Sequence, residues 1–315
     1  MTKIAYFGTS DRSVKILGSL KSNFDLVLCV TKKDTQIGRH QETKETEVKK
    51  WAKTNLVNFV EISSLKDRDL QSVTAQLADL DIDLILVADF SYIIPETLIN
   101  LYKDRLINMH FSLLPLYRGA SPAQFALVNG DLITGITFHL VSKEMDKGDI
   151  ISQFEYKIPH NITSGELYDE MFDYASTLIP EVIKEFYELR SISPTPQDES
   201  RATYTYSPTN PKSTFILKED AKINWNEDVS RIERKVRAFN PWPIAYSTLS
   251  ELSDNLHKLE LENLVLKPSI NKILRIKLLK AKLNGNGKLM IETVQVEGKN
   301  QMFWKEFVNG YLTEK

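Results

Sequence analysis

The sequence predicts a doubly wound α/β domain with a mostly parallel sheet, followed by a small β-barrel. Three observations lead to this prediction. Apolar runs of strand length alternate with helical spacing through the first 189 residues. A polar, proline-containing stretch follows at 191–198, and beyond it short strand-like runs recur with turn signals between them. The 315 residues are enough for two domains of ordinary size.

The first half is expected to alternate strands with helices. The run that ends at Ala88 is continuously apolar, as in a parallel strand covered on both faces. Ser121 is a candidate N-cap, and Pro122 suits the first helical position. The expected strands are Lys3–Phe7, Asp25–Val30, Asp83–Ala88, Arg105–His110, Gly135–Val141 and Ile150–Lys157. The expected helices are Ser13–Leu20, Val48–Lys53, Asp67–Leu80, Pro95–Tyr102, Ser121–Val128 and Ser164–Leu189.

The last third is expected to contain one amphipathic helix, Val229–Phe239, and several short strands. Asn284-Gly285-Asn286-Gly287 is a hairpin turn signal between the last two of them. The expected strands are Ile244–Leu249, Leu259–Leu266, Ile273–Lys282 and Lys288–Val296. These patterns predict an N-terminal domain at 1–189, a linker at 190–205 and a C-terminal domain at 206–315.

The composition is that of a soluble globular protein, with 42% hydrophobic and 26% charged residues. Cys29 is the single cysteine, so no disulfide forms within the chain, and a reducing compartment is expected. The sequence shows no signal peptide and no apolar run long enough to span a bilayer. We therefore expect a cytoplasmic protein without a membrane association, and a monomer.

The charge is unevenly distributed along the chain. Residues 201–315 carry 19 Lys and Arg against 13 Asp and Glu, a net charge of +6, whereas residues 1–200 carry 21 against 29, a net charge of −8. Residues 267–288 include seven basic residues and no acid. A basic second half predicts a polyanionic partner, although a solvated barrel face is the alternative.

The most informative stretch is Asn108-Met109-His110, at the end of an expected strand. In an extended chain, residues i and i+2 point to the same face, so Asn108 and His110 project side by side where open α/β sheets bind ligands. A polar turn between the next two strands returns Asp146 to the same place. An amide donor, an imidazole and a carboxylate can together support acyl transfer, so Asn108, His110 and Asp146 are the candidate catalytic residues.

Alternatives remain at several of these positions. Asp149 is a second candidate carboxylate, and His139, inside an apolar strand, is interpreted as structural. Gly8 begins a turn after the first strand, but the glycines of a dinucleotide fingerprint are missing, which disfavours a nicotinamide oxidoreductase. The five histidines and the single cysteine lack metal-site spacing, so no catalytic metal is expected.

Three motifs resemble those of the folate-dependent formyltransferases: Asn108-x-His110, the stretch from Ser112 to Pro122, and Asp146-x-Gly-Asp. The resemblance covers most of the chain. It implies 10-formyltetrahydrofolate as co-substrate and a C-terminal barrel of the oligonucleotide-binding type. It also implies that the co-substrate site is lined by Ser112, Leu113, Leu114 and Pro115.

A further stretch, Arg237–Pro243, resembles the C-terminal domain of those family members that formylate methionyl-tRNA. The direct role expected for Trp242 is packing at the domain junction. The resemblance then implies initiator methionyl-tRNA as the partner, contacted by Arg39 in a polar loop. The basic stretch adds the candidate tRNA-binding residues Lys272, Arg275, Lys277, Lys280 and Lys282.

The resemblance implies attack of a neutral amine on the formyl carbon, with Asn108 and a protonated His110 holding the oxyanion. Asp146 is expected to orient His110 and to raise its pKa. One alternative is an amino-sugar N-formyltransferase. Another is a non-catalytic folate-binding or RNA-binding relative, because the loop Asp89–Tyr92 departs from the family pattern.

Overall fold

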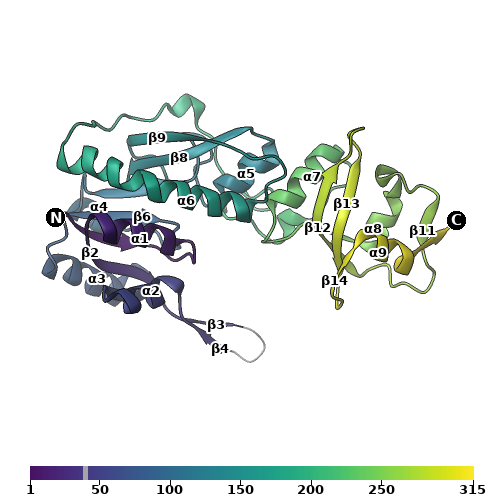
Figure 1. Ribbon diagram of the computed structural model, residues 1–315, viewed down its shortest axis with the longest axis horizontal. Coiled ribbons are helices and arrows are strands. Elements are labelled where there is room, and N and C mark those ends of the chain that lie inside the picture. The colour runs from purple at the N-terminus through teal and green to yellow at the C-terminus, as the bar shows by residue number, and fades with distance from the viewer. Residues whose placement is uncertain (38–41) are drawn as a thin grey trace. The chain divides into compact units, whose positions relative to one another are not determined.

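The computed structural model describes residues 1–37 and 42–315 and divides into two compact units (Figure 1). Unit 1 comprises Met1–Arg118, Gly135–Tyr156 and Asp169–Thr203. Unit 2 comprises Gly119–Thr134, Lys157–Tyr168 and Tyr204–Lys315. Each unit is therefore assembled from segments that are far apart in the sequence.

Unit 1 is built on a seven-stranded sheet in the order β5-β2-β1-β6-β7-β8-β9. The first five strands in this order are parallel, and β8 runs antiparallel to β7, so the predicted mostly parallel α/β sheet is confirmed. The edge strand β5 was not predicted, because its five residues, Asn58–Ile62, show neither a continuous apolar run nor strict alternation. The strands are β1 (Lys3–Phe7), β2 (Asp25–Lys32), β5 (Asn58–Ile62), β6 (Leu84–Ala88), β7 (Leu106–His110), β8 (Ile133–Leu140) and β9 (Ile150–Lys157).

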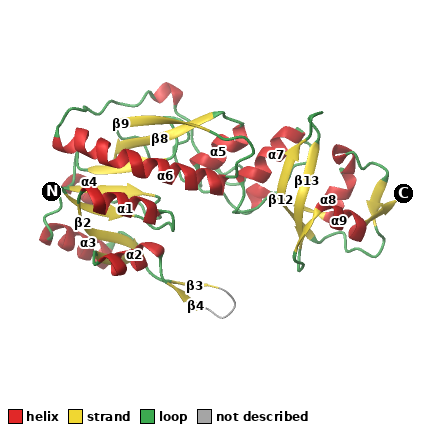
Figure 2. Ribbon diagram, viewed as in Figure 1, coloured by secondary structure: helices red, strands yellow, loops and turns green. Residues whose placement is uncertain are grey.

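Helices cover this sheet, as Figure 2 shows. Ala5 and Phe7 of β1 belong to one buried cluster with Val73 and Leu77 of α3. Because side chains alternate along a strand, Ile4 and Tyr6 face the other side, where they are equally buried. The helices that lie wholly or mostly in this unit are α1 (Ser13–Asn23), α2 (Glu47–Asn55), α3 (Asp67–Asp79), α4 (Glu96–Leu101) and α6 (Ser164–Ile183), and α6 continues into a short π-helix, Lys184–Glu188.

A two-stranded ribbon, β3 (Thr35–Ile37) with β4 (Glu42–Lys44), leaves unit 1 between β2 and α2 (Figure 1). Its base is held by the ammonium group of Lys49, a residue that is only 8% exposed. Lys49 Nζ lies 2.7 Å from Asp34 Oδ2 and 3.0 Å from a carboxylate oxygen of Glu61. These acids neutralise a buried charge that would otherwise be costly.

Unit 2 contains a four-stranded antiparallel sheet, β10-β12-β13-β14, and a two-stranded sheet, β11-β15. The predicted turn at Asn284–Gly287 is confirmed, because the amide of Asn284 bonds the carbonyl of Lys288 across the hairpin. The strands are β10 (Tyr246–Thr248), β11 (Leu264–Leu266), β12 (Arg275–Leu283), β13 (Leu289–Val296), β14 (Gln301–Phe303) and β15 (Leu312–Glu314). The helices are α5 (Pro122–Asn129), α7 (Val229–Ala238), α8 (Leu249–Asp254) and α9 (Trp304–Tyr311).

Two strand predictions in this unit were too long. The run 244–249 ends at Thr248, because its side chain and Glu251 form a capping box that starts α8. The run 259–266 is a strand only over its last three residues. The buried indole of Trp225 donates to Ser247 Oγ at 2.8 Å and so joins β10 to the core of the unit. Among the described residues, no helix is both long and apolar enough to cross a membrane.

We expect Asp220 to support unit 2 through its carboxylate. It accepts hydrogen bonds from Ser207 Oγ, from the amide and hydroxyl of Thr209, and from the amide of Leu217. Burial acts to raise its pKa, but these hydrogen bonds outweigh burial and hold the pKa below the ordinary 3.8. The substitution Asp220→Asn should lower the free energy of unfolding by about 1–3 kcal/mol near neutral pH.

Because the folded-state pKa is lowered, this stabilisation is present above pH 3.8 and is lost as the pH falls through the folded-state value. Urea unfolding of wild type and Asp220→Asn should therefore converge under strongly acidic conditions. A difference that stays constant across this range would contradict the role given to the ionised form.

Candidate active site

The candidate catalytic residues lie where β7 reaches the edge of the seven-stranded sheet. Asn108 and His110 project from this strand, and the antiparallel register of β7 with β8 places His139 directly opposite Asn108. Asn108 Nδ2 lies 3.0 Å from His139 Nε2. Because His139 Nδ1 is 2.8 Å from the carbonyl of Leu140, which can only accept, the proton of a neutral His139 is on Nδ1 and its Nε2 accepts from Asn108.

The ring of His110 is fixed by a backbone carbonyl. His110 Nε2 lies 3.0 Å from the carbonyl oxygen of Tyr117, so Nε2 carries a proton and donates it. In the neutral ring, Nδ1 therefore presents a lone pair. That atom lies 3.7 Å from Asp146 Oδ2, which is an ion-pair distance and too long for a hydrogen bond.

Asp146 stands at the centre of this cluster. Its Oδ1 accepts from Asn108 Nδ2 at 3.4 Å and lies 3.6 Å from His139 Nε2, while Oδ2 faces His110. The backbone of Asp146 adopts a left-handed φ of 55°. Two residues on, a Cβ on Gly148 would lie 1.6 Å from the carbonyl oxygen of Leu140, so this tight turn needs glycine there.

Burial determines the net pKa of His110. The side chain is 6% exposed, and loss of solvation lowers its pKa below the ordinary 6.5. The Asp146 carboxylate acts in the opposite direction but does not overcome burial, and His139 adds to the lowering. The expectation that Asp146 would give His110 a raised pKa is therefore wrong in its net direction. The ring is neutral near pH 7 and can accept a proton.

Sequence reasoning missed His139 as a member of this cluster. Its apolar surroundings suggested a structural histidine, but its ring bonds the amide of Asn108 in the register of β7 and β8. A correct pairing of these two strands would have revealed it. The side chain of Gln197 was also missed: its amide donates to the backbone carbonyls of Asp146 and Gly148.

The turn Ser112–Pro115 follows His110 directly and is bonded largely to its own unit. Thr137 Oγ1 donates to the carbonyl of Ser112 at 2.6 Å and accepts from the amide of Leu114 at 3.1 Å. Gln153 Nε2 donates to the carbonyl of Leu114 at 2.8 Å. Because these polar groups already have partners, the turn offers mainly shape and apolar contact to a bound molecule.

The candidate polyanion-binding residues lie in unit 2, except for Arg39, which is outside the described residues. Arg275, Lys277, Lys280 and Lys282 belong to β12, and Lys272 precedes that strand. Lys280 and Lys282 both form ion pairs with Glu292 of β13, at 3.3 and 2.6 Å, which reduces their attraction for an anion. The Arg275 guanidinium lies 4.5 Å from the centre of the Tyr246 ring.

The stretch Arg237–Pro243 organises part of unit 2. The guanidinium of Arg237 bonds both carboxylate oxygens of Glu233, at 2.6 and 3.0 Å. Asn240 Nδ2 donates to the carbonyl of Leu279 in β12 at 2.9 Å. The side chain of Trp242, near the end of this stretch, is 52% exposed.

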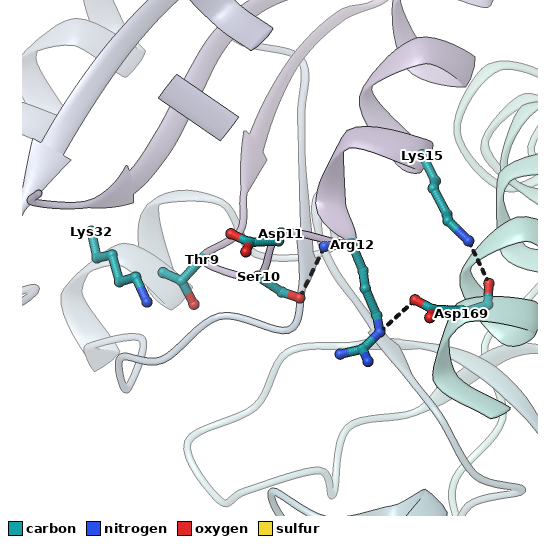
Figure 3. Close-up of a pocket in the computed structure, with 7 residues that line it drawn as sticks. All are labelled: Thr9, Ser10, Asp11, Arg12, Lys15, Lys32 and Asp169. Carbon is teal, nitrogen blue, oxygen red and sulfur yellow. Dashed lines mark hydrogen bonds and ion pairs between the residues drawn. The ribbon is translucent and has the colours of Figure 1, made fainter. Parts of the chain in front are cut away.

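A polar cavity of about 490 Å³ opens at the carboxyl ends of β1 and β2 (Figure 3). The side chains of Arg12 and Lys15 reach from the start of α1 toward Asp169, and the Arg12 Nε to Asp169 Oδ1 distance is 2.8 Å (Figure 3). Since β1, β6 and β7 are parallel, this cavity and the Asn108 cluster lie at the same edge of the sheet. The lining residues are Thr9, Ser10, Asp11, Arg12, Lys15, Lys32 and Asp169.

Within residues 1–37 and 42–315, no three His, Cys, Asp or Glu side chains converge in a metal-binding arrangement. The groups of the Asn108 cluster can position a polarised carbonyl and transfer a proton. Asn108 supplies a neutral donor, His110 a neutral base, and Asp146 a charge that stabilises a cation on His110.

Known protein families match both the N-terminal and the C-terminal part of this chain. Residues 2–183 match the family described as formyl transferase, and residues 216–312 match the formyl transferase C-terminal domain. The methionyl-tRNA formyltransferase of Staphylococcus aureus strain MW2 is 33% identical over 98% of this chain and 96% of its own length.

Solved structures share the fold. A methionyl-tRNA formyltransferase from Clostridium thermocellum has a TM-score of 0.56 at 18% identity, over 94% of this chain and 98% of the other. The sugar 3N-formyl transferase WlaRD has a TM-score of 0.61 at 22% identity, over 95% of this chain and 99% of the other.

We expect His110 to titrate below 6.5 in the free protein. In the variant Asp146→Asn, its pKa should fall further, because the carboxylate is the group that stabilises the imidazolium. NMR titration of ring-labelled histidine measures both values, and His110→Gln identifies the resonance by removing it. A wild-type pKa above 6.5, or an increase in Asp146→Asn, would be inconsistent with this electrostatic balance.

Proposed function

The chain belongs to the formyl transferase family, and we propose that it transfers the formyl group of 10-formyltetrahydrofolate to the α-amino group of initiator methionyl-tRNA. Three findings support the proposal: the two matched family segments, the 33% identity with a methionyl-tRNA formyltransferase over 98% of the chain, and the grouping of Asn108, His110 and Asp146. The last observation carries the chemistry.

In this proposal His110 acts as the base. Its Nε2–H is held by the carbonyl of Tyr117, so the lone pair on Nδ1 is the atom that takes a proton from the attacking amine. The resulting imidazolium is stabilised by the Asp146 carboxylate, whose Oδ2 lies 3.7 Å from Nδ1. Nδ1 then returns the proton to N10 of the folate as the carbon–nitrogen bond to the formyl group breaks. A neutral base with a lowered pKa suits this sequence of steps better than a histidine that starts out protonated.

Asn108 is the proposed donor to the formyl oxygen as it becomes negatively charged. One Nδ2 hydrogen is held by His139 Nε2 at 3.0 Å, which fixes the orientation of the amide. The second, at 3.4 Å from Asp146 Oδ1, has the weaker partner. We propose that the substrate oxygen replaces Asp146 as the acceptor of that second hydrogen, so that the donor is already aligned when charge develops.

The folate site is proposed to use the turn Ser112–Pro115 as a wall. Because the carbonyls of Ser112 and Leu114 are already bonded to Thr137 and Gln153, this wall contributes shape and apolar contact, and hydrogen bonding to folate falls to other groups. Support for the folate partner comes from the family match and from fold neighbours whose structures were solved with 5-N-formyl-THF or folinic acid.

The tRNA is proposed to meet residues 206–315 through its phosphates, and Arg39 through the polar loop. Among the β12 cations, Arg275 and Lys277 are proposed to contribute most to phosphate binding, because Lys280 and Lys282 already form ion pairs with Glu292. Lys272 extends the same basic stretch at its N-terminal end. Contacts of this kind neutralise phosphates without reading a sequence.

An amino-sugar acceptor is the main competing reading. The fold neighbour WlaRD acts on a sugar and aligns over 95% of this chain, but its 22% identity supports the fold alone. The basic stretch at 267–288 favours a polyanionic acceptor over a sugar. Offering the protein both acceptors with the same formyl donor would discriminate between them.

The variants Asn108→Ala and His110→Ala test the proposed chemistry. Loss of the oxyanion donor should lower kcat by about 10²–10³, and loss of the base by about 10²–10⁴, with the far-UV circular dichroism unchanged. Formylmethionine released from charged initiator tRNA is the measurement. Near-wild-type activity in either variant would refute the role assigned to that residue.

Salt dependence tests the tRNA surface. Affinity should fall steeply with salt, and Lys277→Ala should weaken binding and reduce the slope of log K against log[salt] by about one. Lys282→Ala should change the slope less, because Glu292 already lies 2.6 Å from that ammonium group. Lys184→Ala, an exposed cation on the π-helix of unit 1, is the matched control and should leave binding unchanged. Salt-independent binding would contradict the phosphate-contact model.

A further inference from the structure

We propose that Gln197 is a positioning residue for the reaction, holding the turn that carries Asp146, and that Arg118 and Glu199 set the orientation of its amide. The inference deepens the proposed function and rests on it. It concerns a segment between the two matched family regions, 2–183 and 216–312. All of the residues involved belong to unit 1.

Both hydrogens of the Gln197 amide are used on the Asp146 turn. Nε2 lies 2.8 Å from the carbonyl oxygen of Asp146 and 2.8 Å from that of Gly148. The turn needs such support, because Asp146 has a left-handed φ of 55°, which costs on the order of 1 kcal/mol or more for a residue with a side chain. A single side chain thus braces the backbone on both sides of Lys147.

Arg118 fixes which way the amide points. Gln197 Oε1 lies 2.7 Å from Arg118 Nη2 and 3.1 Å from its Nε. A guanidinium has only donors, so the amide oxygen must face it, and the NH₂ group must then face the two carbonyls. A flipped amide would place its hydrogens against those of Arg118 and its oxygen against two carbonyl oxygens.

Glu199 makes the buried charge of Arg118 tolerable. The Arg118 side chain has no solvent exposure, and its Nη1 and Nη2 lie 3.0 and 2.6 Å from the two carboxylate oxygens of Glu199. The Arg118 guanidinium in turn holds the pKa of Glu199 below its usual range. Removing Glu199 would leave the buried guanidinium of Arg118 without its carboxylate partner, so Glu199 supports the group that orients Gln197.

Residues 197–203 also bind the loop that orients His110. Thr203 binds the amides of Tyr117 and Arg118, through its hydroxyl at 2.8 Å and its carbonyl at 2.9 Å. The carbonyl of Tyr117 is the group that orients His110. Residues 197–203 therefore contact both the turn of Asp146 and the loop that aligns His110, and so they define the distance between the two.

Gln197→Met tests this role, since methionine keeps the length of the side chain but can neither donate to the turn nor accept from Arg118. A displacement of Asp146 by a fraction of an ångström should lower kcat about tenfold, and KM for both substrates should stay within about twofold of wild type. The NMR-measured pKa of His110 should fall, because the carboxylate that supports its cation is no longer held in place. Gln124→Met, which removes an amide that bonds Tyr168 in unit 2, is the matched control and should change neither readout.

A double-mutant cycle separates positioning from a general structural effect. If Gln197 acts through Asp146, then Gln197→Met should cost little further activity in an Asp146→Asn background. Fully additive losses in kcat, or an unchanged His110 titration, would overturn the proposal. If Gln197→Met does not fold, Glu199→Gln serves instead, with a smaller loss of about two- to fivefold expected and an unchanged kcat counting against the proposal.

The titration also separates the two levels of inference. It needs no substrate, so a protein without formyl transfer to methionyl-tRNA could still show the fall in the His110 pKa on Gln197→Met. That result would refute the proposed function but leave the positioning role of Gln197 supported. Formyl transfer by the wild-type protein, together with an unchanged His110 pKa in Gln197→Met, would support the proposed function and refute the positioning role.

Discussion

The shared carboxylate of Asp146 is the interaction on which the candidate site depends. One oxygen accepts a hydrogen bond from the Asn108 amide and lies close to the His139 ring. The other oxygen lies 3.7 Å from His110 Nδ1. Burial has already removed the solvent that would support a charged imidazole. Asp146 is therefore the group that stabilises a cation on His110, and it matters most at the moment when the ring takes up a proton.

The fold supplies this arrangement through strand pairing. The antiparallel strand β8 pairs with β7 residue by residue, and this register brings His139 opposite Asn108. The chain then turns at Asp146 before β9. Two adjacent strands and one turn thus bring together an amide, two imidazoles and an acid within hydrogen-bonding or ion-pairing distance.

The two units carry different physical tasks in the proposed function. Unit 1 holds groups that are buried, closely spaced and fixed by hydrogen bonds to the backbone, as proton transfer demands. In unit 2 the β12 cations face solvent to varying degrees, and Glu292 offsets two of them. Such a surface suits contact with phosphates, where charge density matters more than sub-ångström geometry.

Sequence by itself determined the α/β class and most strand positions, because the alternation of strand-like and helix-like segments is a local pattern. It also determined the candidate residues Asn108, His110 and Asp146, because the two-residue spacing of the first two and the family motifs are local patterns as well. Only the tertiary structure decided that His139 joins the trio, that Gln197 braces the Asp146 turn, and that the pKa of His110 is lowered. Strand register, the contacts of an irregular segment and the loss of solvent around a ring all depend on residues distant in the chain. No local pattern encodes them.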